Sequence, residues 1–469
     1  MKFAPIRRFF YHLHLWLGVV SGLILFVVCL SGSLYVFREE ARRLVAPEQF
    51  YVEATGAQRL SADAIVEKVE AAKSGKKVGS LTLPESPTRT ALVVLNDAPK
   101  KGEKGPKGEG KGGEKTGAKP EKGGEKGADQ AGQKPQDAGK DGKGGGKPQG
   151  GKKRGETIYV DPYTGEIVGD GKTSLDEFFG FLMRLHRWLC LPTEIGRPIV
   201  GVATIIYVVI SLTGLILWLP RTAAAWRRKS TWKLALNVRF RRGGWPLVFD
   251  LHNALGFYTL LPALILALTG LCWSFGWYRD AAGAVLGEAP FKAKTEKPEE
   301  LVPPDGAPRA ATLEELIAKH NKLDPGAGDI TISIPQDSET TATTIQKGRV
   351  GGFFALNVKN KTQWDRPDGS VISVERYGKM VEVERFADKP FGAKIASSIR
   401  GIHLGDITGL SSKILAFLVC LIATSFPATG VALWVHKLRA RNKKDEATDA
   451  ASSAADDGAT AEEASEATA

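Results

Sequence analysis

Four long apolar runs limit what this chain can fold into. They cover about residues 14–37, 198–219, 253–278 and 412–435. Each reaches the ~20 residues that an α-helix needs to cross a hydrocarbon core of ~30 Å. Backbone N–H and C=O groups in lipid find no water, so each run must satisfy its hydrogen bonds internally, as a helix does. The sequence therefore predicts an α-helical integral membrane bundle of four transmembrane helices.

Basic residues in the short flanking segments predict the orientation of these helices. Lysine and arginine concentrate at the N-terminus, in the 221–251 segment and from 437 onward. The positive-inside rule places such segments in the cytoplasm, so both termini are predicted to be cytoplasmic and the long segments at about 38–197 and 279–411 to face outward. No small-x-small cleavage motif follows Phe37, so we expect the first run to be a retained anchor.

Each apolar run has one histidine near an end, and these histidines form two pairs. His14 and His252 open the first and third runs at their cytoplasmic ends, whereas His186 and His403 precede the second and fourth runs on the outward side. A neutral imidazole is a common metal ligand, and two imidazoles can hold a haem iron from both faces. Covalent attachment needs a CxxCH motif, which is absent. We therefore predict two bis-histidine haem b groups.

Other interpretations of these histidines remain open. A single histidine at a membrane end is often an interfacial polar residue. Zinc is the competing metal, although its sites use three or four protein ligands and no acidic or cysteine cluster completes such a set. His12 is a reserve ligand should His14 fail, and His320 is expected to face solvent. Four nearby arginines either pair with haem propionates or snorkel to the interface. They are Arg184, Arg187, Arg197 and Arg400.

The two halves of the chain repeat the same motifs. The first and third runs share His-x-x-x-Gly and a second glycine eighteen residues after the histidine, and the second and fourth runs share Thr-Gly-x-x-x-Trp. Motifs kept at matched spacing indicate two parallel repeats of two spans each. The glycine one turn after each cytoplasmic histidine leaves a gap in which a flat macrocycle can approach the backbone. The repeated glycines are Gly18, Gly32 and Gly214 in the first half and Gly256, Gly270 and Gly430 in the second.

The outward segments are predicted to fold as two small α+β domains. Each contains a polar periodic stretch that predicts a helix, then a short strand, then a strand–turn–strand; in the second domain Thr312 and Glu315 are placed as a capping box. These elements begin at Ser61, 81 and 159 in the first domain and at Thr312, 332 and 374 in the second.

Two segments lack the apolar residues that a core needs. Residues 99–155 are nearly all Gly, Lys, Glu, Pro, Gln and Asp, so we predict a disordered insertion, and the acidic tail from Asp445 is predicted to be disordered as well. These observations predict the organisation of the whole chain. The expected segments are 1–37, N-terminus and first span; 38–173, first outward domain; 174–220, interfacial helix and second span; 221–251, basic loop; 252–278, third span; 279–390, second outward domain; 391–436, interfacial helix and fourth span; 437–469, cytoplasmic tail.

These motifs resemble the PepSY-associated transmembrane family. The matching stretches are H-L-W-L-G at 14–18, L-H-R-W-L at 185–189, D-L-H-N-A-L-G-F at 250–257 and I-H-L-G-D at 402–406, with the T-G-x-x-x-W helix ends and the strand pair at 159–168. The resemblance implies a bacterial inner-membrane protein, often associated with iron uptake, in a family that includes di-haem siderophore reductases. It supports haem at the four histidines. Some relatives carry a fused flavin-binding reductase region that has no counterpart here, which leaves the electron donor and the direction of flow open.

Together, these observations predict a di-haem b electron-transfer protein, an oxidoreductase that reduces a periplasmic ferric siderophore or other ferric chelate and releases Fe(II). No catalytic side chain is assigned. Electrons must enter from a quinol, a reduced flavin or a separate reductase, since G-D-G-K-T at 169–173 fails the phosphate-loop spacing. The formal charge of +12 reflects membrane flanks and low complexity, so nucleic acid is excluded as a partner. The alternatives are a protease-inhibitory or sensor membrane protein without redox activity and, ranked last, a siderophore permease.

Overall fold

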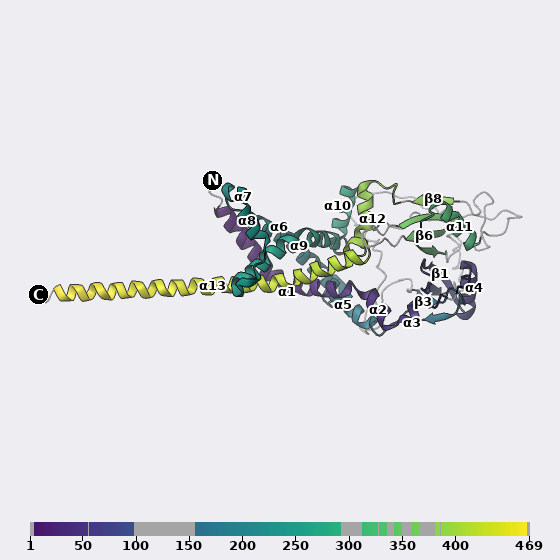
Figure 1. The fold of residues 1–469 in the computed structure, drawn as a ribbon, viewed down its shortest axis with the longest axis horizontal. Coiled ribbons are helices and arrows are strands. Elements are labelled where there is room, and N and C mark those ends of the chain that lie inside the picture. Colours follow the sequence, from purple (N-terminus) through teal and green to yellow (C-terminus); the bar gives the residue numbers. More distant parts are fainter. Residues whose placement is uncertain are drawn as a thin grey trace, which may run out of the picture. The chain divides into compact units, whose positions relative to one another are not determined.

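A computed structural model describes residues 4–54, 56–97, 155–291, 312–326, 328–334, 342–348, 359–365, 380–384 and 386–466. The chain divides into two compact units (Figure 1). The helical unit comprises Met1–Arg38, Phe178–Val285 and Ser398–Ala469, and the sheet unit comprises Glu39–Glu177 and Leu286–Ser397.

Within the described part of the chain, four helices of the helical unit are long and apolar enough to cross a membrane, as predicted. They are α1 (Ala4–Tyr35), α6 (Thr193–Trp218), α9 (Gly244–Ser274) and α13 (Leu410–Glu466). Helix α1 packs against α6 and α13, and α9 packs against the same two, so α1 and α9 occupy opposite corners of the bundle. The close approach of α1 and α13 depends on Gly22, where an added Cβ would lie 3.2 Å from Cβ of Pro427.

Shorter helices flank the spans. Helix α5 (Asp176–Trp188) precedes α6, and α12 (Phe391–Leu404) precedes α13. The chain turns between α5 and α6 at Leu189 and Cys190, both at positive φ, and Pro192 caps α6. Pro198 lies inside α6, near its start. It removes one backbone donor in the second turn, a loss that membrane helices tolerate. The other short helices of this unit are α7 (Ala223–Arg227), α8 (Lys229–Leu236), η1 (Phe240–Arg242) and α10 (Gly276–Leu286).

The C-terminal segment differs from the expected disordered tail. Helix α13 continues to Glu466, well past the apolar run that ends near residue 435, and is the long yellow helix of Figure 1. Alanine, the most frequent residue of this segment, is the strongest helix former, so local propensity extends the helix without an apolar face to bury.

In the described residues, the sheet unit is built on one antiparallel sheet of eight strands in the order β4-β3-β2-β1-β5-β6-β7-β8. Two helices with side-chain N-caps pack with it, α4 (Ala62–Ala72, capped by Ser61) and α11 (Leu313–Leu323), and the predicted capping box of Thr312 and Glu315 is confirmed. Short helices α2 (Arg38–Val45) and α3 (Pro47–Phe50) lead into the unit. The strands are β1 (Lys76–Leu83), β2 (Ala91–Asp97), β3 (Glu156–Val160), β4 (Ile167–Gly169), β5 (Asp329–Ser333), β6 (Ala342–Gly348), β7 (Lys359–Asp365) and β8 (Met380–Glu384).

The two predicted α+β domains share this sheet rather than standing apart. Strands β1 and β5 pair antiparallel, and Thr82 and Thr331 hydrogen-bond across the seam at 3.0 Å. The two helices also cap each other, because Asp63 on α4 accepts from the backbone N–H groups of Leu313 and Glu314, and Glu314 accepts from the N–H of Ala62. Pairing of β1 with β5 thus covers two strands that would otherwise be unpaired sheet edges.

The core of the sheet unit lies between the sheet and its helices. Ile65 and Val69 of α4 pack with Leu316 of α11 and with the inward residues of β1 to β3, such as Leu81 and Val93. The predicted 99–155 insertion, which begins after β2 and ends before β3, falls almost wholly outside the described residues, as does most of the strand–turn–strand expected at 374–383.

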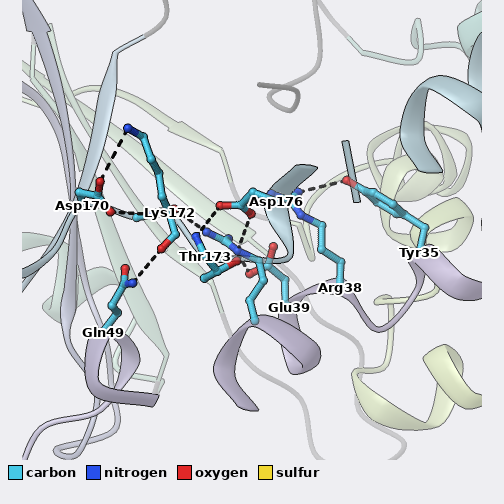
Figure 2. A network of polar contacts seen from close by, with 10 residues as sticks. Tyr35, Arg38, Glu39, Gln49, Asp170, Lys172, Thr173 and Asp176 are labelled. Carbon is cyan, nitrogen blue, oxygen red and sulfur yellow. Dashed lines mark hydrogen bonds and ion pairs between the residues drawn. The ribbon is translucent and has the colours of Figure 1, made fainter. Parts of the chain in front are cut away.

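A polar network fixes the chain where α5 begins. Arg42 of α2 forms an ion pair with Asp176 of α5 at 3.1 Å and donates to the carbonyl oxygen of Gly171 at 2.6 Å. Asp176 also accepts from the backbone N–H of Thr173, and Gln49 donates to the carbonyl of Lys172 (Figure 2). Because Arg42 is buried, its charge needs this carboxylate, and the start of α5 is held in place.

Candidate paired-histidine sites

The first pair, His14 on α1 and His252 on α9, is fixed to neighbouring helices through Nδ1. Nδ1 of His14 lies 3.0 Å from the carbonyl oxygen of Ile210 and 3.1 Å from Oγ1 of Thr213, both on α6. Nδ1 of His252 lies 2.8 Å from Oγ1 of Thr429 on α13. The Thr429 hydroxyl donates to main-chain carbonyls of its own helix, so it accepts the proton of His252.

The second pair, His186 on α5 and His403 on α12, is held in the same manner. Nδ1 of His186 donates to the carbonyl oxygen of Val28 on α1 at 2.9 Å. Nδ1 of His403 donates to the carbonyl oxygen of Leu266 on α9 at 3.0 Å and lies 3.2 Å from Oγ1 of Thr269. Helices α1 and α9 therefore each carry one histidine of the first pair and hold one histidine of the second.

Each imidazole also rests against a glycine of the helix that holds it. These are the glycines of the repeated motifs, and their role beneath the rings was not predicted from the sequence. An added Cβ would press on the imidazole at Gly32, Gly214 and Gly270, whereas at Gly430 the distance is that of an ordinary contact. The distances from an added Cβ to Cε1 of the ring are 3.0 Å for Gly32 and His186, 3.1 Å for Gly214 and His14, 2.8 Å for Gly270 and His403, and 3.5 Å for Gly430 and His252.

These contacts decide which ring nitrogen is left for a ligand. With Nδ1 donating its proton, each imidazole is the tautomer whose Nε2 carries a free lone pair. Histidine ligands of metals are commonly oriented in this way, by a carbonyl or hydroxyl on the nitrogen that does not bind the metal. In all four candidate residues, Nε2 is therefore the nitrogen available to a ligand.

The second pair has the spacing of two ligands on one metal ion. The ring centroids of His186 and His403 are 6.2 Å apart, with 51° between the ring planes. Two Nε2 atoms at about 2.0 Å from a shared metal place the ring centroids roughly 6 Å apart. Burial lowers the pKa of His186, and burial together with the neighbouring His186 lowers the pKa of His403 to about 4, so both rings are neutral at pH 7, the form that binds metals.

The first pair lines a large cavity. His14 and His252 interact electrostatically across it, and its volume is about 1840 Å³. The predicted gaps are present, because nothing lies within 4 Å of a Cβ added at Gly18 or Gly256, and both glycines line the cavity. Five basic residues and no acidic residue are found among the described residues that line it. The basic residues are Arg7, Arg8, Arg221, Arg227 and Lys437.

The residues of both sites fit haem better than a bare metal ion. No cluster of three or more His, Cys, Asp or Glu side chains that could hold a metal occurs in the described part of the chain. Two imidazoles alone suit an iron whose other four ligands come from a macrocycle. In addition, Nε1 of Trp218, beside the first pair, and Nε1 of Trp188, two residues after His186, are buried without a hydrogen-bond partner. Such donors fit a ligand with acceptor groups.

Arg187 lies near both histidines of the second pair, and Arg197 lies near Arg187. Burial and the proximity of Arg197 lower the pKa of Arg187, which also acts electrostatically on His186 and His403. None of the four arginines considered as partners of haem propionates, namely Arg184, Arg187, Arg197 and Arg400, has an acidic partner among the described residues. The guanidinium of Arg187 lies 4.9 Å above the ring of Trp188. An anionic group bound here would relieve this positive charge, as the propionate interpretation expects.

The remaining histidines have other surroundings. His12 is exposed and its ring contacts Tyr11, so the geometry favours His14 as the ligand. His436 stacks on Trp245 at 4.5 Å. The expectation that His320 faces solvent is wrong, because the side chain is fully buried in the sheet unit, on the face of α11 that packs inward.

A family model described as PepSY-associated TM region matches residues 11–437, a range that covers the four apolar runs and both histidine pairs. No curated protein matches the chain. The family match confirms the resemblance noted from the sequence motifs.

Proposed function

Because this chain belongs to the PepSY-associated transmembrane family, we propose that this multi-pass membrane protein carries electrons across the bacterial inner membrane on two b-type haems. The first pair would hold one haem near the cytoplasm, and the second pair would hold the other near the periplasm. The electrons would reduce a ferric siderophore or similar ferric chelate in the periplasm. We further propose that the matched halves of the chain are parallel repeats.

The common geometry of the four histidines carries this proposal. Each ring is bound at Nδ1 by an adjacent helix and backed by a motif glycine. Interfacial histidines have no need of such matched support, which leaves Nε2 of two imidazoles available at each of the two sites.

The haems and the chain would have different roles in electron transfer. Bound haem supplies one-electron chemistry at iron, and the chain sets its position and surroundings. Two sites divide a hydrocarbon core of ~30 Å into shorter electron-transfer steps. The arginines near the second pair attract anionic groups at the outward end. Fe(II) is a softer cation than Fe(III) and is held less tightly by oxygen ligands, so reduction releases the metal from an oxygen-rich chelate.

Haem content and iron reduction test the proposal together. Protein purified from haem-replete cells should contain two haems per chain and give a reduced-minus-oxidised spectrum of low-spin b-type haem. In proteoliposomes with a reductant on the cytoplasmic side only, a ferrous-specific dye outside should report Fe(II) from a ferric siderophore. A colourless preparation contradicts the proposal, as does haem-containing protein that never reduces an external ferric chelate.

A further inference from the structure

The cavity at the first pair is larger than one haem requires. Sites for drug-sized ligands and cofactors have volumes of about 300–1,000 Å³. The cavity lined by His14 and His252 has about 1840 Å³. A second ligand of several rings can therefore lie beside the haem.

The charge of the cavity exceeds what a haem neutralises. Arg7 is occupied, because its guanidinium donates to carbonyl oxygens at the end of α6, including that of Leu219 at 3.1 Å. It also lies near enough to Arg221 for the two charges to repel. The other four basic residues of the lining have no acidic partner among the described residues. The two propionates of a haem balance two of these charges, and two remain for another anion.

Aromatic rings connect the cavity opening with its wall. Trp226 lines the cavity and is 48% exposed, and its ring contacts Trp232 edge-on. Trp232 contacts Trp218, which stacks on Phe257 at 4.0 Å. The indole N–H groups of Trp226 and Trp232 donate to backbone carbonyls, which fixes both rings. Phe257 follows Gly256, where the lining is open.

We infer that this opening binds reduced flavin mononucleotide, which delivers electrons to the first histidine pair. Its planar ring system suits the aromatic rings around Trp226, and its phosphate dianion suits the surplus charge of Arg221 and Arg227. A quinol is less suited, because it carries no charge to pair with these guanidinium groups. This inference rests on the proposed function, since it names the donor for the same electron path.

The electrons and protons of this step balance. Reduced flavin mononucleotide becomes the oxidised flavin and releases two electrons and two protons. The electrons pass singly through the two sites and reduce two ferric chelates to the ferrous state. The two protons are released at the cytoplasmic side, where the flavin is bound.

Flavin fluorescence measures this binding independently of electron transfer. Oxidised flavin mononucleotide is titrated into haem-loaded protein in lipid nanodiscs, and riboflavin, which lacks the phosphate, is titrated in parallel. We expect saturable quenching by the nucleotide and at least tenfold weaker binding of riboflavin. The double variant Arg221→Gln/Arg227→Gln should bind the nucleotide at least tenfold more weakly. Lys233→Gln/Arg241→Gln, which removes the same charge from exposed positions outside the cavity lining, should bind as the wild type does.

The outcomes separate this inference from the proposed function. Equal affinity for riboflavin and the nucleotide, or an unchanged double variant, overturns the flavin site, as does the absence of saturable quenching. Haem is measured by absorbance on the same samples. If the protein contains two haems but binds no flavin nucleotide, the flavin site is contradicted and the proposed function stands. If the protein binds the nucleotide but contains no haem, the proposed function is contradicted.

Discussion

The two histidine pairs share a mode of attachment but differ in the space around them. His186 and His403 lie on helices that precede the spans, and their rings are 6.2 Å apart. His14 and His252 lie on the spanning helices α1 and α9, at opposite corners of the bundle, and line a cavity of about 1840 Å³. The second pair is a close fit for one metal centre, whereas the first pair has room for a further ligand.

This difference indicates separate tasks for the two ends. Under the proposed function, a closely fitted second site would limit which groups reach a bound iron, so an external ferric chelate would receive its electron at the haem edge rather than by binding the metal. A roomy, basic site lets a donor approach from the other side.

The largest effect is expected for removal of one ligand of the second pair. His403→Ala leaves His186 alone, so the haem content should fall from two per chain to one, with the spectrum of the first haem unchanged. Haem per chain is measured by pyridine haemochrome. His12→Ala is the control, because His12 is exposed and should leave both haems in place. Loss of the first haem in His403→Ala would show that the pairing is wrong.

The open space at Gly18 gives the next largest effect. Gly18→Leu places a side chain where the first haem is proposed to approach α1, and overpacking of about 2–3 kcal/mol should weaken that haem roughly 100-fold. The second haem should remain. Haem titration into apoprotein measures both sites. Gly276→Leu, at a glycine that also has nothing within 4 Å of an added Cβ but lies outside the cavity lining, is the matched control. Unchanged haem affinity in Gly18→Leu would mean that this space is not used.

Replacing the glycines that contact the imidazole rings should weaken haem binding most where the added Cβ lies closest to the ring. In Gly270→Ala the new Cβ lies 2.8 Å from Cε1 of His403, so the ring must shift, and we expect the second haem to bind about tenfold more weakly. In Gly430→Ala the distance to His252 is 3.5 Å, an ordinary contact, and the first haem should be little affected. Both changes favour the helix, so folding is retained. Equal losses in the two variants would refute the idea that the second site is the tighter one.

Sequence patterns were sufficient to locate the spans and the four histidines. Both depend on local signals, namely apolar length and motif spacing, which fix helices and place residues at their ends. The expected gaps at Gly18 and Gly256 are likewise present. The contact of each ring with Gly32, Gly214 or their counterparts was not foreseen, because it joins helices whose packing no single segment specifies. The shared Thr-Gly motif of the second and fourth spans was the available signal.

The sheet unit shows why other expectations failed. The joining of both halves through β1 and β5 depends on pairing between residues about 250 positions apart, such as Thr82 and Thr331. His320 was assigned to solvent because its helix is polar, yet the inward face of that helix includes it. Helix α13 extends beyond its apolar run because propensity alone suffices there. Tertiary packing decided the first two cases and local propensity the third.

The smallest effect concerns the hydroxyl groups that orient the rings. His252 has Thr429 Oγ1 as its Nδ1 acceptor, whereas His403 has the carbonyl of Leu266 in addition to Thr269. Thr429→Val removes the acceptor and should cost about 1 kcal/mol, close to a fivefold loss in affinity for the first haem. Thr269→Val, the matched change, leaves the carbonyl at 3.0 Å and should have almost no effect on the second haem. Haem titration of both variants measures the difference, and because valine matches threonine in size, a loss of similar magnitude at both sites would mean that the threonines act through packing and not through ring orientation.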